Sequence, residues 1–146
     1  GQTGLSNLQR RWEGQMVDTT QELEVIQTAK AAAPIGPYSQ AIRANGFIFV
    51  AGEKGIDPTT NAIVAGGIPA ETRQTLENIR NILEEAGSSM SRVVATTVYL
   101  TDINTFGEMN KVYAEYFTSN PPGRTTVGVT SLPAGAQVEI TVTALA

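Results

Sequence analysis

The chain has 146 residues, 41% of them hydrophobic and 16% charged, a length that fits one domain with a substantial core. Ten Lys and Arg against fourteen Asp and Glu give a net charge of -4, and an acidic chain is a poor nonspecific ligand for nucleic acid. Cysteine and histidine are absent, which excludes disulfides, thiolate nucleophiles, cysteine-based metal sites and the usual general base near neutral pH.

The N-terminal 22 residues differ from the rest of the chain in composition and pattern. They are polar, begin with Gly rather than Met, and carry a weak helical pattern in Leu5, Leu8, Trp12 and Met16. We expect an N-terminal tail or vector-derived leader over residues 1–22 and one domain over residues 23–146. No apolar run reaches the roughly 18 residues of a membrane span, and the start lacks the features of a secretory signal. We therefore expect a cytoplasmic protein with no membrane partner.

The first half of the domain alternates strands and turns. Strands are expected at residues 24–28, 39–43 and 47–51. The pair Asn45-Gly46 between the last two supplies the positive φ values of a tight hairpin turn.

Two amphipathic helices follow. The first is expected at residues 69–86, with Pro69 in its first turn and Gly87 just beyond its end. Its expected buried face consists of Leu76, Ile79, Ile82, Leu83 and Ala86.

The second helix is expected at residues 105–117, after a strand at residues 92–100. Thr105 and Glu108 predict a capping box at its start. The spacing of its large apolar residues predicts a buried stripe of Phe106, Met109, Tyr113 and Tyr116.

The last two strands are expected at residues 125–130 and 137–144. Alternation in the final strand places Val138, Ile140, Val142 and Ala144 on the face beneath the helices. The resulting class is α+β, with about six strands and two helices packed on one face. Because the opposite face is rich in Thr rather than in Lys and Glu, we expect it to meet another subunit.

Without His and Cys, two charged residues are the main candidates for chemistry. Arg124 at a strand entrance offers a planar two-point fork for a carboxylate, although an exposed solvating Arg fits the sequence as well. Glu139 interrupts the final strand on its non-core side and is a candidate general base or water-orienting group, or else a solvated strand residue. If the last two strands are antiparallel neighbours, the two side chains share a face of the sheet.

Weaker candidates lie in two glycine-containing segments. Tyr38 leaves the rigid loop Gly36-Pro37 and is placed to close over a ligand or to pack in the core. Gly52 would let backbone N–H groups approach a ligand. The sequence holds no Walker-type loop, dinucleotide fingerprint or metal-ligand spacing.

These stretches together resemble the reactive intermediate deaminase family (Rid/YjgF, also labelled endoribonuclease L-PSP), over roughly residues 24–146. The segments that carry the resemblance are Gly36-Pro37-Tyr38-Ser39-Gln40-Ala41, Phe49-Val50-Ala51-Gly52, Glu77-Asn78-Ile79, Thr96-Thr97-Val98-Tyr99-Leu100-Thr101-Asp102, Asn110-Lys111-Val112-Tyr113, Pro122-Gly123-Arg124-Thr125-Thr126-Val127 and Leu132-Pro133 followed by Val138-Glu139-Ile140.

The resemblance implies a chorismate-mutase-like fold with a mixed sheet and a homotrimer with clefts between subunits. It implies hydrolysis of reactive enamines or imines such as 2-aminoacrylate, small carboxylates, to 2-keto acids and ammonia, with no cofactor. Carried over by position, Arg124 binds the substrate carboxylate and Glu139 holds the attacking water. The same resemblance gives substrate-binding roles to Tyr38, Gly52, Asn110 and Thr126.

The chain departs from the family pattern in three places. Ala51-Gly52-Glu53 stands where Ser-Gly-Gln is usual, Thr126 stands where Cys is usual, and the loop before Arg124 is shorter. The first two departures leave open a noncatalytic trimer that binds a small carboxylate. A deaminase acting on another unsaturated amino acid, such as an aminomuconate, is a further alternative. The older ribonuclease label is disfavoured by the acidic charge and the lack of His.

Overall fold

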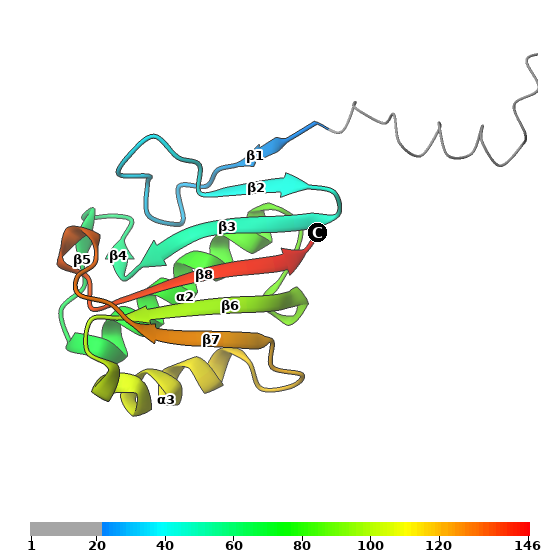
Figure 1. The fold of residues 1–146 in the computed structure, drawn as a ribbon. Helices are drawn as coiled ribbons and strands as arrows, with labels where there is room; N and C mark the ends of the chain where they lie inside the picture. The colour runs from blue at the N-terminus through cyan, green and yellow to red at the C-terminus, as the bar shows by residue number, and fades with distance from the viewer. Residues whose placement is uncertain (1–21) are drawn as a thin grey trace, which may run out of the picture.

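The fold is built on one six-stranded sheet (Figure 1) in the computed structural model, which describes residues 22–146. The strand order is β1-β2-β3-β8-β6-β7. The strands are β1 (Glu24–Ile26), β2 (Ala41–Ala44), β3 (Phe47–Lys54), β6 (Val93–Leu100), β7 (Gly123–Gly128) and β8 (Val138–Leu145). The leader expected over residues 1–22, with its weak helix, lies outside the described residues apart from Glu22.

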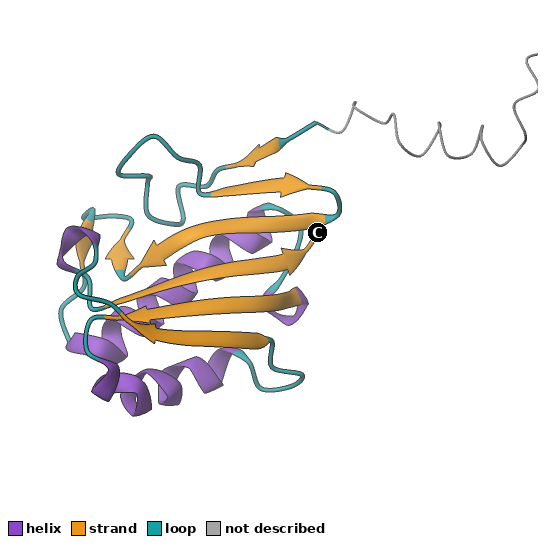
Figure 2. Cartoon of the chain, in the orientation of Figure 1, coloured by secondary structure: helices purple, strands orange, loops and turns teal. Residues whose placement is uncertain are grey.

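Two helices cover one face of this sheet (Figure 2), as the sequence predicts for the α+β class. They are α2 (Gly67–Glu85) and α3 (Phe106–Tyr116). A separate two-stranded sheet pairs β4 (Ile56–Asp57) with β5 (Ala62–Ile63). Short 3-10 turns occupy Met90–Arg92, Ile103–Thr105 and Pro133–Gly135. No helix within residues 22–146 is both long and apolar enough to cross a membrane.

The β2–β3 hairpin has the predicted turn. Asn45 and Gly46 have φ values of 50° and 82°, and Ala44 pairs directly with Phe47 across the turn. The expected end of the third strand at Ala51 is wrong, because β3 continues through Gly52 to Lys54 with a register shift against β8 between Val50 and Glu53. The strand therefore bulges at the position where the sequence predicts its end.

The helix α2 confirms the predicted buried face. Leu76, Ile79, Ile82 and Leu83 are fully buried, and Ala86 is 6% exposed. The chain leaves the helix through Gly87 with a φ of 80°. Gly66, with a φ of 117°, precedes the first turn, so the helix begins two residues before the predicted Pro69.

The start of α3 differs from the prediction. The Thr105 hydroxyl donates to the carbonyl of Asp102 at 2.6 Å, and Asp102 Oδ1 accepts from the Asn104 N–H at 3.0 Å, so the capping box is wrong. A 3-10 turn precedes the helix and takes its cap from Asp102. The predicted stripe is also partly wrong, since Met109 and Tyr113 are buried whereas Phe106 is 41% exposed.

The connection from β6 through α3 to β7 fixes the edge of the sheet. It returns the chain in the same direction, so β7 pairs with β6 in parallel. β8 pairs with β3 and β6, and β6 therefore separates β8 from β7. The expectation that the last two strands are antiparallel neighbours is wrong.

Candidate functional site

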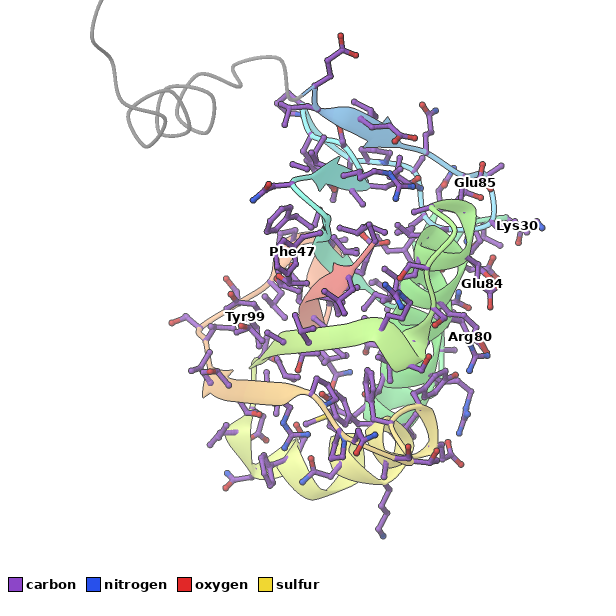
Figure 3. All side chains as sticks on the ribbon, turned by 90° about the vertical axis from the view of Figure 1, so that its right-hand side faces the viewer. Lys30, Phe47, Arg80, Glu84, Glu85 and Tyr99 are labelled. Carbon is purple, nitrogen blue, oxygen red and sulfur yellow. The ribbon has the colours of Figure 1, made fainter. Side chains whose placement is uncertain are left out.

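Glu139 projects from the middle of the sheet on the side away from the helices. It is the register partner of Tyr99 on β6 and of Lys54 on β3. In Figure 3, Tyr99 and Phe47 extend from that outer side, whereas Arg80 and Glu84 belong to α2 on the other. The fully buried neighbours of Glu139, Val138 and Ile140, point beneath the helices, as predicted.

The glycine of the β3 bulge makes room for this carboxylate. A Cβ added to Gly52 would lie 2.8 Å from the Cδ of Glu139 and 3.2 Å from its Cγ, closer than ordinary carbon–carbon contact. The register shift between Val50 and Glu53 brings the Gly52 backbone under the Glu139 side chain. Gly52 therefore lets the Glu139 side chain lie against the β3 backbone, a role different from the backbone contacts to a ligand that the sequence predicts.

A cleft of about 430 Å³ opens beside this carboxylate. We call it the glutamate cleft, and its lining residues are Ile35, Tyr38, Ala51, Gly52, Lys54, Pro133 and Glu139. Tyr38 is 42% exposed, so the alternative of a core tyrosine is wrong. Its Oη accepts a hydrogen bond from the Ile35 N–H at 3.1 Å, which fixes the ring against its own loop. The structure thus brings together Tyr38, Gly52 and Glu139, three of the predicted site residues.

Sequence reasoning missed Lys54. Its Nζ donates to the Gly52 carbonyl at 3.2 Å and lies 3.5 Å from Glu139 Oε1, and its side chain is only 6% exposed. From the sequence alone, a lysine just beyond the expected end of a strand is predicted to be exposed to solvent. Only the β3–β8 register, which spans 85 positions of the chain, shows that it faces Glu139.

Glu53 points to the opposite side of β3 and is buried with 5% exposure. Among residues 22–146, its Oε1 has no hydrogen-bond partner. Burial raises the pKa of Glu53 to about 8; Lys54 opposes this shift and the Glu139 charge adds to it. Glu53 is therefore mainly protonated at neutral pH. It lines a second, much smaller cavity that shares Tyr38 and Lys54 as walls with the glutamate cleft.

Arg124 lies on the edge strand β7 and belongs to a separate group of residues. Its guanidinium carbon is 4.7 Å from the Tyr113 ring centroid and 5.4 Å from that of Phe106. Within the described part of the chain it forms no ion pair. A half-buried cation that stacks on aromatic rings and has no carboxylate partner there is well placed to receive an external anion.

The other predicted residues near Arg124 share its surroundings. Thr126 lies two positions along β7 on the same face, and Asn110 lies one turn after Phe106 on α3. The Tyr113 hydroxyl lies 2.8 Å from Thr96 Oγ1. Burial raises the pKa of Tyr113, while the Thr96 hydrogen bond and the Arg124 charge oppose the shift. We call Phe106, Asn110, Tyr113, Arg124 and Thr126 the arginine cluster.

Arg124 and Glu139 do not share a face of the sheet. Arg124 is in register with Thr96, which pairs with the buried Val142, whereas Glu139 is in register with Tyr99. Because register partners point to the same side, Arg124 lies on the helix side and Glu139 on the outer side. The expected convergence of the two within one chain is wrong, and its physical cause is the parallel crossover that inserts β6 between their strands.

Comparisons with known proteins agree with the fold. The Endoribonuclease L-PSP family model matches residues 28–146. A RutC family protein of Pyrococcus abyssi is 54% identical over 117 residues, 80% of this chain and 92% of the relative. The 2-iminobutanoate/2-iminopropanoate deaminase of Homo sapiens is 45% identical over 121 residues, 83% of this chain and 88% of the relative. The crystal structure of a Rid family protein from Yersinia pestis has a TM-score of 0.83 and 43% identity, covering 86% of this chain and 100% of that one.

The close approach at the bulge predicts the effect of Gly52→Ala. The new methyl group displaces the Glu139 side chain and lowers the free energy of unfolding by about 1–2 kcal/mol, because the partly exposed carboxylate can move aside. Urea unfolding and a crystal structure of the variant measure both effects. Gly107→Ala is the control, since a Cβ at Gly107 meets no atom within 4 Å. An unmoved Glu139 in Gly52→Ala contradicts the prediction.

Burial of Glu53 predicts that Glu53→Gln raises the free energy of unfolding by an amount that depends on pH. The pKa of Glu53 is about 8 when folded against 4.5 for an exposed carboxyl, so its stabilising contribution is complete below pH 4.5 and is lost as the pH rises to 8. We expect Glu53→Gln to be more stable than wild type by about 2–4 kcal/mol at pH 9, with the gain vanishing near pH 4.5. Urea unfolding at both pH values measures this difference.

The exposed Glu85→Gln is the control for Glu53→Gln, and its difference from wild type should not change with pH in this way. Equal stability of Glu53→Gln and wild type at pH 9 contradicts the assignment of a neutral Glu53.

Proposed function

Because the chain belongs to the Rid family, the group described as Endoribonuclease L-PSP, we propose that it hydrolyses enamines and imines of the 2-aminoacrylate type to 2-keto acids and ammonia. Kinship to proteins named 2-iminobutanoate/2-iminopropanoate deaminases supports hydrolytic deamination. The single observation that carries the proposal is the carboxylate of Glu139, held over Gly52 at the wall of a cleft sized for a small acid. A cytoplasmic location belongs to the same proposal.

The reaction needs a positioned carboxylate, a water molecule and a binding group for the substrate anion. Arg124 binds the substrate carboxylate through two parallel N–H donors. An enamine first takes a proton at carbon and becomes the iminium, whose carbon is electrophilic. Glu139 accepts a proton from water as the oxygen bonds to that carbon. The same proton then passes to the amine nitrogen. As the carbon–nitrogen bond breaks and ammonia leaves, the hydroxyl gives its proton to Glu139 and its oxygen becomes the carbonyl of the keto acid. Glu139 then passes this proton to ammonia, which leaves as ammonium, and the carboxylate is restored. The atoms and electrons of this hydrolysis balance without a cofactor.

Arg124 and Glu139 lie on opposite faces of the sheet, and this placement supports an active site shared between copies of the chain. We propose that the arginine cluster of one subunit faces the glutamate cleft of its neighbour in a homotrimer. The outer face of the sheet fits a subunit interface, since Val25, Phe49 and Val127 are 59%, 47% and 37% exposed on it. The surrounding positions on that face carry Thr97, Thr141 and Thr143. Such a surface is more apolar than a solvated sheet face usually is.

A ligand-binding trimer without turnover is the second candidate. It is favoured by Ala51, which lines the glutamate cleft without the hydroxyl that is usual in the family pattern. A rise in melting temperature with a small carboxylate such as serine or pyruvate, and no product from any enamine, would support this candidate instead.

The mechanism predicts that Arg124→Lys and Glu139→Gln change different kinetic parameters. Glu139→Gln removes the proton acceptor and lowers kcat by about 100-fold or more. Arg124→Lys keeps the charge but removes the fork, and raises KM at least about tenfold. The assay follows keto acid and ammonia from 2-aminoacrylate generated in situ. The control Arg73→Lys alters an exposed arginine paired with Glu115 and should leave the rate unchanged.

Full activity in Glu139→Gln would exclude this mechanism. A normal KM in Arg124→Lys would exclude the proposed binding role of the guanidinium.

The shared site predicts complementation between two inactive variants. When Arg124→Ala and Glu139→Gln chains are unfolded together and refolded, about one quarter of clefts should contain an intact Arg124 and an intact Glu139 from different chains. Deaminase activity should therefore return to that fraction of wild type. The control is the same mixture without unfolding, in which subunits do not exchange. If activity does not return although mixed trimers form, the two residues do not come from different subunits.

A further inference from the structure

The buried ammonium of Lys54 has no role in the reaction as described so far. Its β3 position makes it the register partner of Glu139, and the Nζ–Oε1 distance is 3.5 Å. Burying a charged group costs several kcal/mol unless a partner compensates it. The ammonium contacts Glu139 and the Gly52 carbonyl, and both residues line the cleft.

The neighbouring Glu53 does not compete for this ammonium. It is the register partner of Ile140 and thus lies on the helix side of the sheet. Its buried carboxyl is mainly neutral at neutral pH for the reason given above. The positive charge of Lys54 is therefore matched chiefly by one anion, Glu139.

We propose that Lys54 is a positioning residue of the deaminase site, which fixes the Glu139 carboxylate over Gly52 and compensates its negative charge. The proposal rests on the proposed function. An uncompensated carboxylate at the cleft wall would repel an anionic substrate and would also be free to rotate away from Gly52. With Lys54 in place, the glutamate cleft has no net charge, so the Arg124 guanidinium of a neighbouring subunit determines where the substrate carboxylate binds. This arrangement favours imino acids with one carboxylate and a small apolar side chain, which Ile35, Ala51 and Pro133 would contact.

Other titratable groups surround this pair on every packed element. They are Tyr38 from the loop before β2, Glu53 on β3, Tyr99 on β6 and Glu71 on α2, whose carboxylate accepts from the Gln137 N–H at the start of β8. Lys54 is the only cation among them and the pair. Its removal therefore leaves the Glu139 carboxylate without a compensating positive charge.

The test uses Lys54→Met, which keeps the length and apolar contacts of the side chain without its charge. At neutral pH we expect kcat to fall about tenfold, because the Glu139 carboxylate is no longer held in place, and KM for the anionic substrate to rise, because the charge of that carboxylate is no longer compensated. Lys30→Met, at an exposed position, is the control and should match wild type.

Rescue tests the charge itself. The chain has no cysteine, so Lys54→Cys followed by 2-bromoethylamine places a single ammonium at nearly the original length. This adduct should restore kcat and KM, while unmodified Lys54→Cys should resemble Lys54→Met. Failure of the correctly folded adduct to restore either parameter overturns the proposal. Borohydride-dependent trapping of a keto acid on Lys54 would also overturn it, because it would make Lys54 a covalent catalyst.

A second readout does not depend on turnover. In a crystal structure of Lys54→Met, the Glu139 carboxylate should no longer lie over the Gly52 backbone, whereas in Lys30→Met it should stay there. If no enamine is hydrolysed by wild type, the proposed function fails while this structure still tests the pairing. An unmoved Glu139 carboxylate in Lys54→Met overturns the role of Lys54 even if the enzyme is active.

Discussion

The strict alternation of β8 is the constraint on which the site depends. Val138, Ile140, Val142 and Ala144 are at most 1% exposed beneath the helices. β8 lies between β3 and β6, so both of its edges are fixed by pairing. A shift of one residue would bury Glu139 in the core and expose four apolar side chains, at a cost that no local contact could offset. The position of Glu139 on the outer face is thus a consequence of the hydrophobic core.

Features set by neighbouring residues could be predicted from the sequence. The Asn45-Gly46 turn, the buried face of α2 and the alternation of β8 each depend on residues a few positions apart. The predicted capping box at Thr105 is wrong because the Asp102 carbonyl accepts hydrogen bonds from both the N–H and the hydroxyl of Thr105, and the motif alone does not show this competing partner. The candidate residues themselves could be chosen from the residue types that remain once His and Cys are absent, together with the family resemblance.

Features set by strand order could not be predicted in this way. The insertion of β6 between β8 and β7 depends on how the chain crosses over through α3, and it decides that Arg124 and Glu139 face opposite sides. The positions of the Lys54 and Glu53 side chains could not be predicted for a related reason. They are adjacent in sequence, yet the bulged β3 directs one to the cleft and the other to the interior, and only the register with β8 shows which. This placement of Arg124 and Glu139 on opposite faces is the basis of the shared site proposed between chains.

The lining of the glutamate cleft has a chemical consequence of its own. The imines and iminium ions of the proposed substrate class carry an electrophilic carbon, which thiols, imidazoles and free amines can attack. The whole sequence has neither Cys nor His, and the amine in the cleft, that of Lys54, lies 3.5 Å from a carboxylate with only 6% of its side chain exposed. An ammonium ion has no lone pair with which to attack. The proposed site therefore offers such an electrophile few nucleophiles besides water.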